Sequence, residues 1–85
     1  MKKIYEMYRH MDDGPDGYIV AESEYDALSS DWYEYGGENA SAYELSEEEV
    51  QDRYEEIMST EPSKRDSLDE DFLLAYEEYK KQFEK

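Results

Sequence analysis

Two short runs of tyrosine and aliphatic residues open the chain, and a turn sequence separates them. Residues 4–10 and 18–21 are rich in the residue types that favour β-strands. Between them, residues 14–17 read Gly-Pro-Asp-Gly, in which proline presets φ for a turn and glycine lets the chain leave it. We therefore predict an antiparallel hairpin. A helix remains open for the first run, because its apolar residues also recur at helical spacing.

The middle of the chain predicts a short helix, a loop and a third strand. Ser23 precedes Glu24 and can act as the N-cap of a helix that runs to about Ser30. Residues 36–39, Gly-Gly-Glu-Asn, are typical of a loop. Residues 42–45, Ala-Tyr-Glu-Leu, then predict a third strand.

A capping box marks the start of the next helix. In residues 46–49, Ser-Glu-Glu-Glu, the serine hydroxyl and the last carboxylate can each accept a backbone N–H of the first turn. Four apolar residues then recur on one face, and the Glu-Pro-Ser sequence at residues 61–63 ends the helix. These apolar residues are Val50, Tyr54, Ile57 and Met58.

The C-terminal helix is the clearest element in the pattern. Residues 67–70, Ser-Leu-Asp-Glu, repeat the capping box. Five apolar residues behind it form a stripe about 80° wide at 100° per residue, and the acidic first turn and basic last turn both suit the helix dipole. Leu74 projects opposite the stripe, which hints at a dimer or partner contact. The stripe contains Leu68, Phe72, Tyr76, Tyr79 and Phe83.

These elements predict an α+β fold in one small domain over residues 1–85. A small antiparallel sheet of two or three strands packs against two C-terminal helices, with a short helix between. Few aliphatic residues and a high net charge are typical of disordered chains. Ten tyrosines and one tryptophan favour an ordered core instead, because aromatic side chains bury more area per residue than aliphatic ones.

The distribution of charge along the chain is the most informative feature of the sequence. The chain carries 25 acidic and 9 basic residues, a net charge of −16 at pH 7. Residues 12–62 hold seventeen acidic residues and a single base, Arg53, so this segment accounts for the whole excess. Repulsion among these acids destabilises the fold, and a basic partner surface would relieve it. We expect no direct binding to nucleic acid and none to anionic membranes.

Several functional classes are excluded by the residues that are missing. The absence of cysteine excludes a disulfide scaffold, a Cys-ligated zinc site, an iron–sulfur cluster and a cysteine nucleophile. His10 is the single histidine, and there is no phosphate-binding loop or nucleophile elbow, so we predict no enzyme and no cofactor. Polar residues interrupt residues 4–10, where a signal peptide would be apolar, so we expect a cytoplasmic protein.

One segment resembles an EF-hand calcium loop. Asp12 and Asp16 occupy its first and fifth positions, and a glycine occupies the sixth. The third position lacks a ligand, and a serine stands where a bidentate glutamate closes the coordination shell. Glu22 and Glu24 lie one place on either side of that serine. These four carboxylates are a weak candidate metal site, and an acidic turn is the simpler interpretation.

The helix predicted after residue 46 is a stronger candidate for a binding site than this calcium-loop segment. With Val50 at zero and 100° per residue, five acidic residues lie between about 140° and 260°, directly away from the apolar face. They span about 12 Å of axis, or about one charge per 2.4 Å, against one per 1.7 Å of duplex DNA. We predict that this face binds a partner; the alternative is a solvated surface. The five are Glu48, Glu49, Asp52, Glu55 and Glu56.

A second candidate contact lies in residues 31–38. Trp32, Tyr33 and Tyr35 can form an exposed aromatic patch. Three acidic residues lie just before, among and just after them and would extend the negative partner-binding surface. These are Asp31, Glu34 and Glu38.

The size, the negative charge, the abundance of tyrosine and acid, and the missing catalytic residues together resemble a known class of proteins. This class is the small acidic DNA-mimic inhibitors that phages use against host defences, the anti-CRISPR and antirestriction proteins. The likeness extends over the whole chain and includes no sequence motif. It implies a non-enzymatic inhibitor in the host cytoplasm that occupies the DNA-binding or PAM-reading cleft of a basic nucleic-acid-binding protein, such as a CRISPR effector or a restriction enzyme.

Two other functions stay open from the sequence. One is a calcium-binding, EF-hand-like module built on residues 12–24. The other is an acidic adaptor protein that binds its partner without mimicking DNA. The oligomeric state is also open, because Leu74 alone does not decide it.

Overall fold

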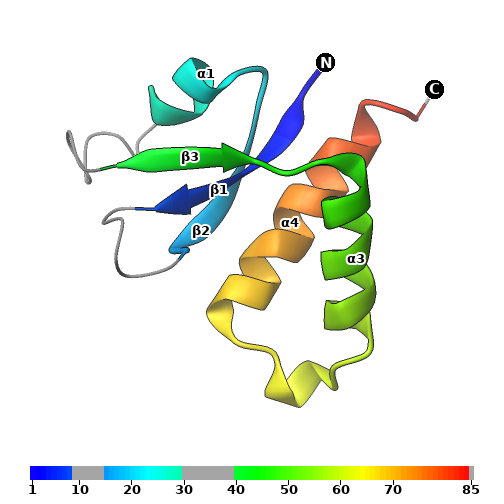
Figure 1. Cartoon of the computed structure of the whole chain (residues 1–85). Coiled ribbons are helices and arrows are strands. Elements are labelled where there is room, and N and C mark those ends of the chain that lie inside the picture. Colours follow the sequence, from blue (N-terminus) through cyan, green and yellow to red (C-terminus); the bar gives the residue numbers. More distant parts are fainter. Residues whose placement is uncertain (9–14, 30–39, 85) are drawn as a thin grey trace.

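The computed structural model describes residues 1–8, 15–29 and 40–84, and it shows a three-stranded antiparallel sheet with helices on both faces (Figure 1). The elements in chain order are β1 (Lys3–Tyr8), β2 (Gly17–Ala21), α1 (Glu24–Leu28), β3 (Ser41–Glu44), α3 (Glu47–Met58), the short 3-10 helix η2 (Pro62–Lys64) and α4 (Ser67–Lys81). β1 is the central strand, between β2 and β3. The predicted α+β class is confirmed, with a small sheet and two C-terminal helices.

The first run of the chain is a strand, so the helical alternative is wrong. β1 pairs in antiparallel register with β2, which places Glu6 opposite Tyr18, and with β3, which places Glu6 opposite Tyr43. Helices cover both faces of β1, so its buried residues are consecutive instead of alternating. That unbroken run also produced the helical spacing in the sequence. Residues 9–14 and 36–39 lie outside the described residues.

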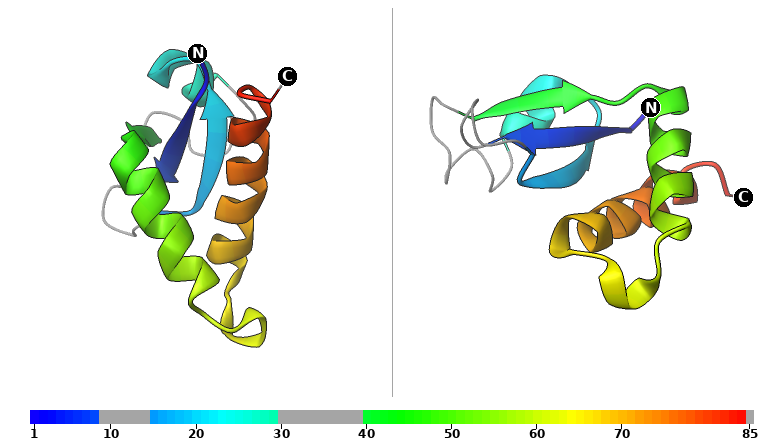
Figure 2. Two further views of the ribbon diagram at one scale, coloured as in Figure 1. Left: turned by 90° about the vertical axis from the view of Figure 1, so that its right-hand side faces the viewer. Right: turned by 60° about the horizontal axis from the view of Figure 1, so that its bottom comes forward.

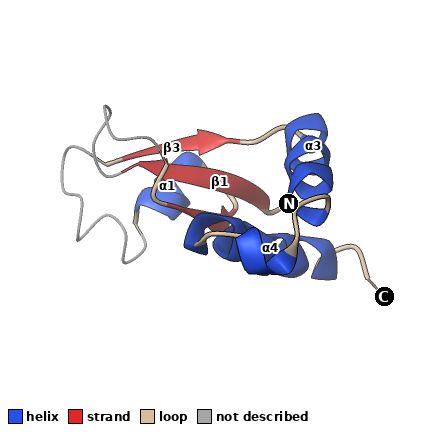
Figure 3. Ribbon diagram, turned by 90° about the horizontal axis from the view of Figure 1, so that it is seen from below, coloured by secondary structure: helices blue, strands red, loops and turns tan. Residues whose placement is uncertain are grey.

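The sheet separates two hydrophobic cores. Ile4 and Tyr18 pack against Phe72 on the face that α3 and α4 cover. Tyr5 and Met7 pack with Ala27 of α1 on the opposite face. Figure 3 shows α3 at one end of the sheet, directly after β3, so the acidic helix is attached to the edge of the sheet through Leu45 and Ser46.

α3 and α4 form an antiparallel helical hairpin that η2 closes (Figure 2). Val50 and Ile57 are buried, and the Tyr54 ring stacks on Tyr76 with centroids 4.1 Å apart. Met58 was predicted on this buried face, but its side chain is 51% exposed because it lies about 80° around the helix from Val50. No helix in the described parts of the chain is long and apolar enough to cross a bilayer.

The start of α4 differs from the predicted capping box. The N-cap is Asp66, not Ser67, and the Asp66 carboxylate accepts the backbone N–H of Asp69 at 2.8 Å. Both side chains are good caps, and the position one residue earlier adds a full helical residue to α4. The apolar stripe is confirmed for Phe72 and Tyr79, which are buried, whereas Phe83 lies beyond the helix end and is 45% exposed.

Candidate partner-binding surface

The outer side of α3 carries four exposed carboxylates, Glu48, Asp52, Glu55 and Glu56, which we call the acidic face. The helix presents them on one side because its opposite side packs against α4 and the sheet through Val50 and Ile57. In the described part of the chain, no lysine or arginine forms an ion pair with any of the four. The Glu55 carboxylate accepts one hydrogen bond, from the Gln51 side chain at 3.2 Å.

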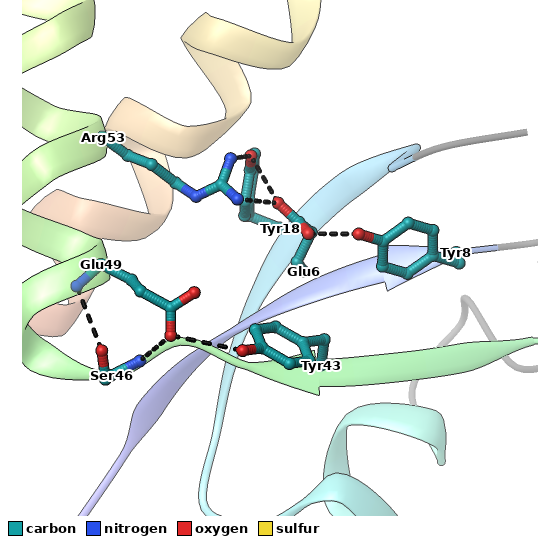
Figure 4. A network of polar contacts seen from close by, with 7 residues as sticks. All are labelled: Glu6, Tyr8, Tyr18, Tyr43, Ser46, Glu49 and Arg53. Carbon is teal, nitrogen blue, oxygen red and sulfur yellow. Dashed lines mark hydrogen bonds and ion pairs between the residues drawn. The ribbon is translucent and has the colours of Figure 1, made fainter.

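Glu49, the fifth acid of the predicted set, belongs to the helix cap instead. The Ser46 backbone N–H donates to the Glu49 carboxylate, and the Glu49 backbone N–H donates to the Ser46 hydroxyl, both at 3.1 Å (Figure 4). The Tyr43 hydroxyl also donates to the same carboxylate oxygen, at 3.5 Å. This capping box was predicted from the sequence and is confirmed. It fixes the first turn of α3 against β3 and draws the Glu49 charge away from the acidic face.

A buried polar network lies beneath α3, and sequence reasoning missed it (Figure 4). The Glu6 side chain is only 5% exposed, and its carboxylate lies 2.9 Å from the Arg53 guanidinium. The hydroxyls of Tyr8 and Tyr18 donate to the two carboxylate oxygens of Glu6. The Tyr18 oxygen in turn accepts a hydrogen bond from Arg53 at 3.1 Å. The buried charge is therefore both paired and hydrogen-bonded, as burial requires.

Two signals in the sequence could have revealed this network. Glu6 is an acid in the middle of a strand whose neighbours are buried on both sides. Arg53 is the single base of residues 12–62, and it lies about 60° from Val50 on the flank of the apolar face, not among the acids. A buried acid on a strand requires a partner that offsets its charge. The isolated base on the helix flank is the candidate for that partner.

The network raises the pKa of two tyrosines. The pKa of Tyr8 rises to about 12, first because its hydroxyl donates to Glu6 and second because it is desolvated. Burial raises the pKa of Tyr18 to about 12, although the nearby Arg53 charge opposes the shift. On the other face of the sheet, burial and a 3.0 Å hydrogen bond to Glu44 raise the pKa of Tyr5 to about 12.

The second predicted contact and part of the metal candidate lie outside the described residues. This applies to Asp12 and to all six candidate contact residues of the 31–38 segment, namely Asp31, Trp32, Tyr33, Glu34, Tyr35 and Glu38. Asp16 and Glu22 directly flank the two ends of β2, so about six strand steps of 3.3 Å place them about 20 Å apart. Two carboxylates at that separation cannot bind one ion, and Glu24 already belongs to α1.

The other described residues offer no alternative metal centre: they contain no group of three or more His, Asp or Glu side chains arranged to hold an ion. The acidic face thus remains the main feature of this surface. Comparisons with protein-family models, with curated proteins and with solved structures each give no match for the chain.

Proposed function

We propose that the protein is a non-enzymatic inhibitor of a nucleic-acid-binding defence protein, of the anti-CRISPR or antirestriction type. In this proposal the acidic face occupies a basic DNA-binding cleft, with carboxylates where phosphates would lie. The single observation that carries the proposal is that four exposed carboxylates share one side of α3, and none forms an ion pair with a base in the described part of the chain. An ordinary solvated helix gains from basic residues one turn away from its acids, whereas α3 has no lysine and its single arginine pairs with Glu6.

The spacing of the four charges fits a single phosphate strand. Glu48 and Glu56 are eight residues apart, or about 12 Å along the axis at 1.5 Å per residue. Four charges over that length give about one per 3 Å, close to the one per 3.4 Å along one strand of DNA. With Glu49 assigned to the cap, the acidic face therefore matches a strand of DNA more closely than a duplex.

The placement of Arg53 supports the same proposal. It is the single base of α3, and its guanidinium turns inward to Glu6 instead of outward to the acids. The helix is also rigidly seated, since the capping box holds its first turn and Val50 and Ile57 anchor its buried side. A rigid array of charges loses little entropy on binding, so electrostatic attraction is retained as affinity and association rate.

The proposal is tested by capture and specific elution. Immobilised protein is incubated with bacterial lysate at low salt, and bound proteins are eluted either with short duplex DNA or with salt of equal ionic strength. We expect DNA to release nucleic-acid-binding proteins that the matched salt does not, because DNA and the acidic face compete for one cleft. If DNA releases nothing beyond the salt control, the protein is an adaptor that does not mimic nucleic acid.

A pair of matched variants locates the binding energy. Reversing Glu48, Asp52 and Glu55 to lysine should abolish DNA-sensitive capture, because attraction becomes repulsion along one helix face. The control reverses three exposed acids elsewhere by the same total charge and should retain most of the capture. It uses Glu61, Glu70 and Glu78. Equal losses in the two variants would show that only net charge matters.

A further inference from the structure

A groove of about 740 Å³ runs between α3 and α4, and no residue of the sheet lines it. Its apolar lining includes Tyr54 and Met58 from α3 and Leu73 and Tyr76 from α4. A smaller hollow of about 280 Å³ shares Tyr76 with it and extends along the two helices toward the end of α4. We call the surface formed by these two hollows the hairpin groove.

Apolar side chains in the hairpin groove are only partly covered by the rest of the described chain. Met58 is 51% exposed, and Phe83, at the far end of the groove, is 45% exposed. The Tyr54 and Tyr76 rings stack on each other and are only half-buried. A continuous apolar strip is uncommon on a chain in which 40% of the residues are charged, and such strips mark contact surfaces.

The smaller hollow of the hairpin groove carries opposite charges on its two banks, whereas the α4 bank of the larger hollow is mixed, with Lys80 and Lys81 beside Glu77 and Glu84. Among the described residues neither lysine forms an ion pair. The Lys80 ammonium lies 5.7 Å from the centroid of the Tyr76 ring. Glu47 lies on the α3 bank, near the start of the helix and level with the last turn of α4. A partner that fits the smaller hollow must therefore offer positive charge to Glu47 and negative charge to Lys80.

We propose that this partner is a second copy of the chain, with the two hairpin grooves packed face to face. The two-fold axis lies parallel to the helices, so α3 of each copy packs on α4 of the other and the four helices form a bundle. Glu47 of one copy then lies level with Lys80 of the other. A two-fold axis across the helices would instead stack α3 on α3 and separate Glu47 from Lys80 of the other copy.

This dimer leaves the acidic face free. On the helical wheel of α3, Tyr54 and Met58 lie at about 40° and 80° from Val50, whereas the acidic face centres near 200°. The dimer therefore displays two acidic faces on opposite flanks of the bundle. The inference goes beyond the proposed function and does not rest on it, because none of the four acidic-face residues is needed for the packing.

The test is the oligomeric state of the full chain. Sedimentation equilibrium over a hundredfold concentration range, at about 0.15 M salt to screen the net charge, should show the mass rising from that of one chain to that of two. Met58→Lys should weaken the dimer by about tenfold or more, as expected when a residue central to an interface is replaced. Leu74→Lys is the matched control, since Leu74 is 67% exposed and does not line the groove.

Charge reversal tests the orientation of the two copies. Lys80→Glu and Glu47→Lys should each weaken the dimer, and the two together should restore it, because the pair is re-formed with its signs exchanged. Circular dichroism on each variant confirms that the monomer is folded. A chain that stays monomeric at every concentration overturns the proposal. So does a dimer that Leu74→Lys disrupts as strongly as Met58→Lys, because the contact then lies elsewhere.

Discussion

The Arg53 guanidinium lies 2.9 Å from the Glu6 carboxylate, and this pair joins the acidic helix to the central strand of the sheet. The two residues are 47 positions apart in the chain, so the contact exists only in the folded state. The contact offsets the buried charge of Glu6. It also keeps the single base of α3 away from the acidic face. Stability and surface charge are therefore linked through one arginine.

The first prediction concerns this pair. Arg53→Met should destabilise the fold by about 2–3 kcal/mol, somewhat below the range for fully buried pairs because the Arg53 side chain is 38% exposed. Glu6→Gln should be milder, since the remaining arginine can reach solvent. Urea unfolding of both variants and of the double variant measures the effects. A smaller loss for Arg53→Met than for Glu6→Gln would contradict this account.

The second prediction is a loss of stability at alkaline pH. The folded pKa values of Tyr5, Tyr8 and Tyr18 lie at about 12, above the ordinary tyrosine value of 10.0. Above pH 10 the unfolded chain releases these protons first, so stability is fully present below pH 10 and decreases as the pH rises toward 12. Urea unfolding midpoints measured from pH 9 upward report the change in stability. Tyrosinate absorbance reports the ionisation of the tyrosines over the same range.

Two single substitutions identify which tyrosines cause the alkaline transition. Tyr8→Phe and Tyr18→Phe each remove one titrating group, so each should flatten the decrease in stability above pH 10. Tyr25→Phe is the control, because Tyr25 is 82% exposed. If the control flattens the decrease as much as the two network variants do, the buried network is not the source of the pH dependence.

The third prediction concerns salt. Unpaired acids on one helix face repel each other, and added salt screens the repulsion, so the melting temperature should rise with sodium chloride concentration. Replacing all four acidic-face residues by glutamine should raise the melting temperature at low salt and reduce its dependence on salt. A melting temperature that salt leaves unchanged would mean that the acids are far enough apart to form an ordinary solvated surface.

The fourth prediction separates the two helix caps. Ser46→Ala should lose about 1 kcal/mol of stability, because the Ser46 hydroxyl accepts the first-turn N–H of Glu49. Asp66→Ala should lose about as much at the start of α4, whereas Ser67→Ala should be nearly neutral, because Asp66 is the cap there. Urea unfolding of the three variants decides between the cap seen in the structure and the one expected from sequence.

The fifth prediction concerns calcium. Asp16 and Glu22 flank opposite ends of β2, so calcium and magnesium should raise the melting temperature equally and only slightly, by screening. Thermal unfolding at matched ionic strength measures both. A shift that is selective for calcium would show that residues 12–24 bind the ion and would favour the calcium-binding alternative.

Much of the fold could be predicted from local sequence. The capping box from Ser46 to Glu49, the pairing of β1 with β2, and the apolar stripe through Phe72 and Tyr79 all act between residues close in the chain. Hydrogen bonds within one turn and helical periodicity depend on neighbours alone, so spacing predicts them. The shift of the α4 cap to Asp66 is a local error, because two good capping residues stand side by side.

Which residues form the candidate site could be decided only from the folded structure. The sequence predicts Glu49 both for the capping box and for the acidic helix face, and only the structure shows that the Tyr43 hydroxyl of β3 also donates to it. Met58 has the periodicity of a buried residue, yet α4 leaves it exposed at the hairpin groove.

Sequence alone determined most of the elements, the excess of negative charge and its concentration in residues 12–62. Tertiary structure decided which charges remain on the surface. Burial of Glu6 on the central strand required a cation from another element, and the packing of α3 on the sheet supplied Arg53. A contact between residues so far apart in the chain leaves no periodic pattern in the sequence, because it depends on how two elements pack and not on the spacing within either one.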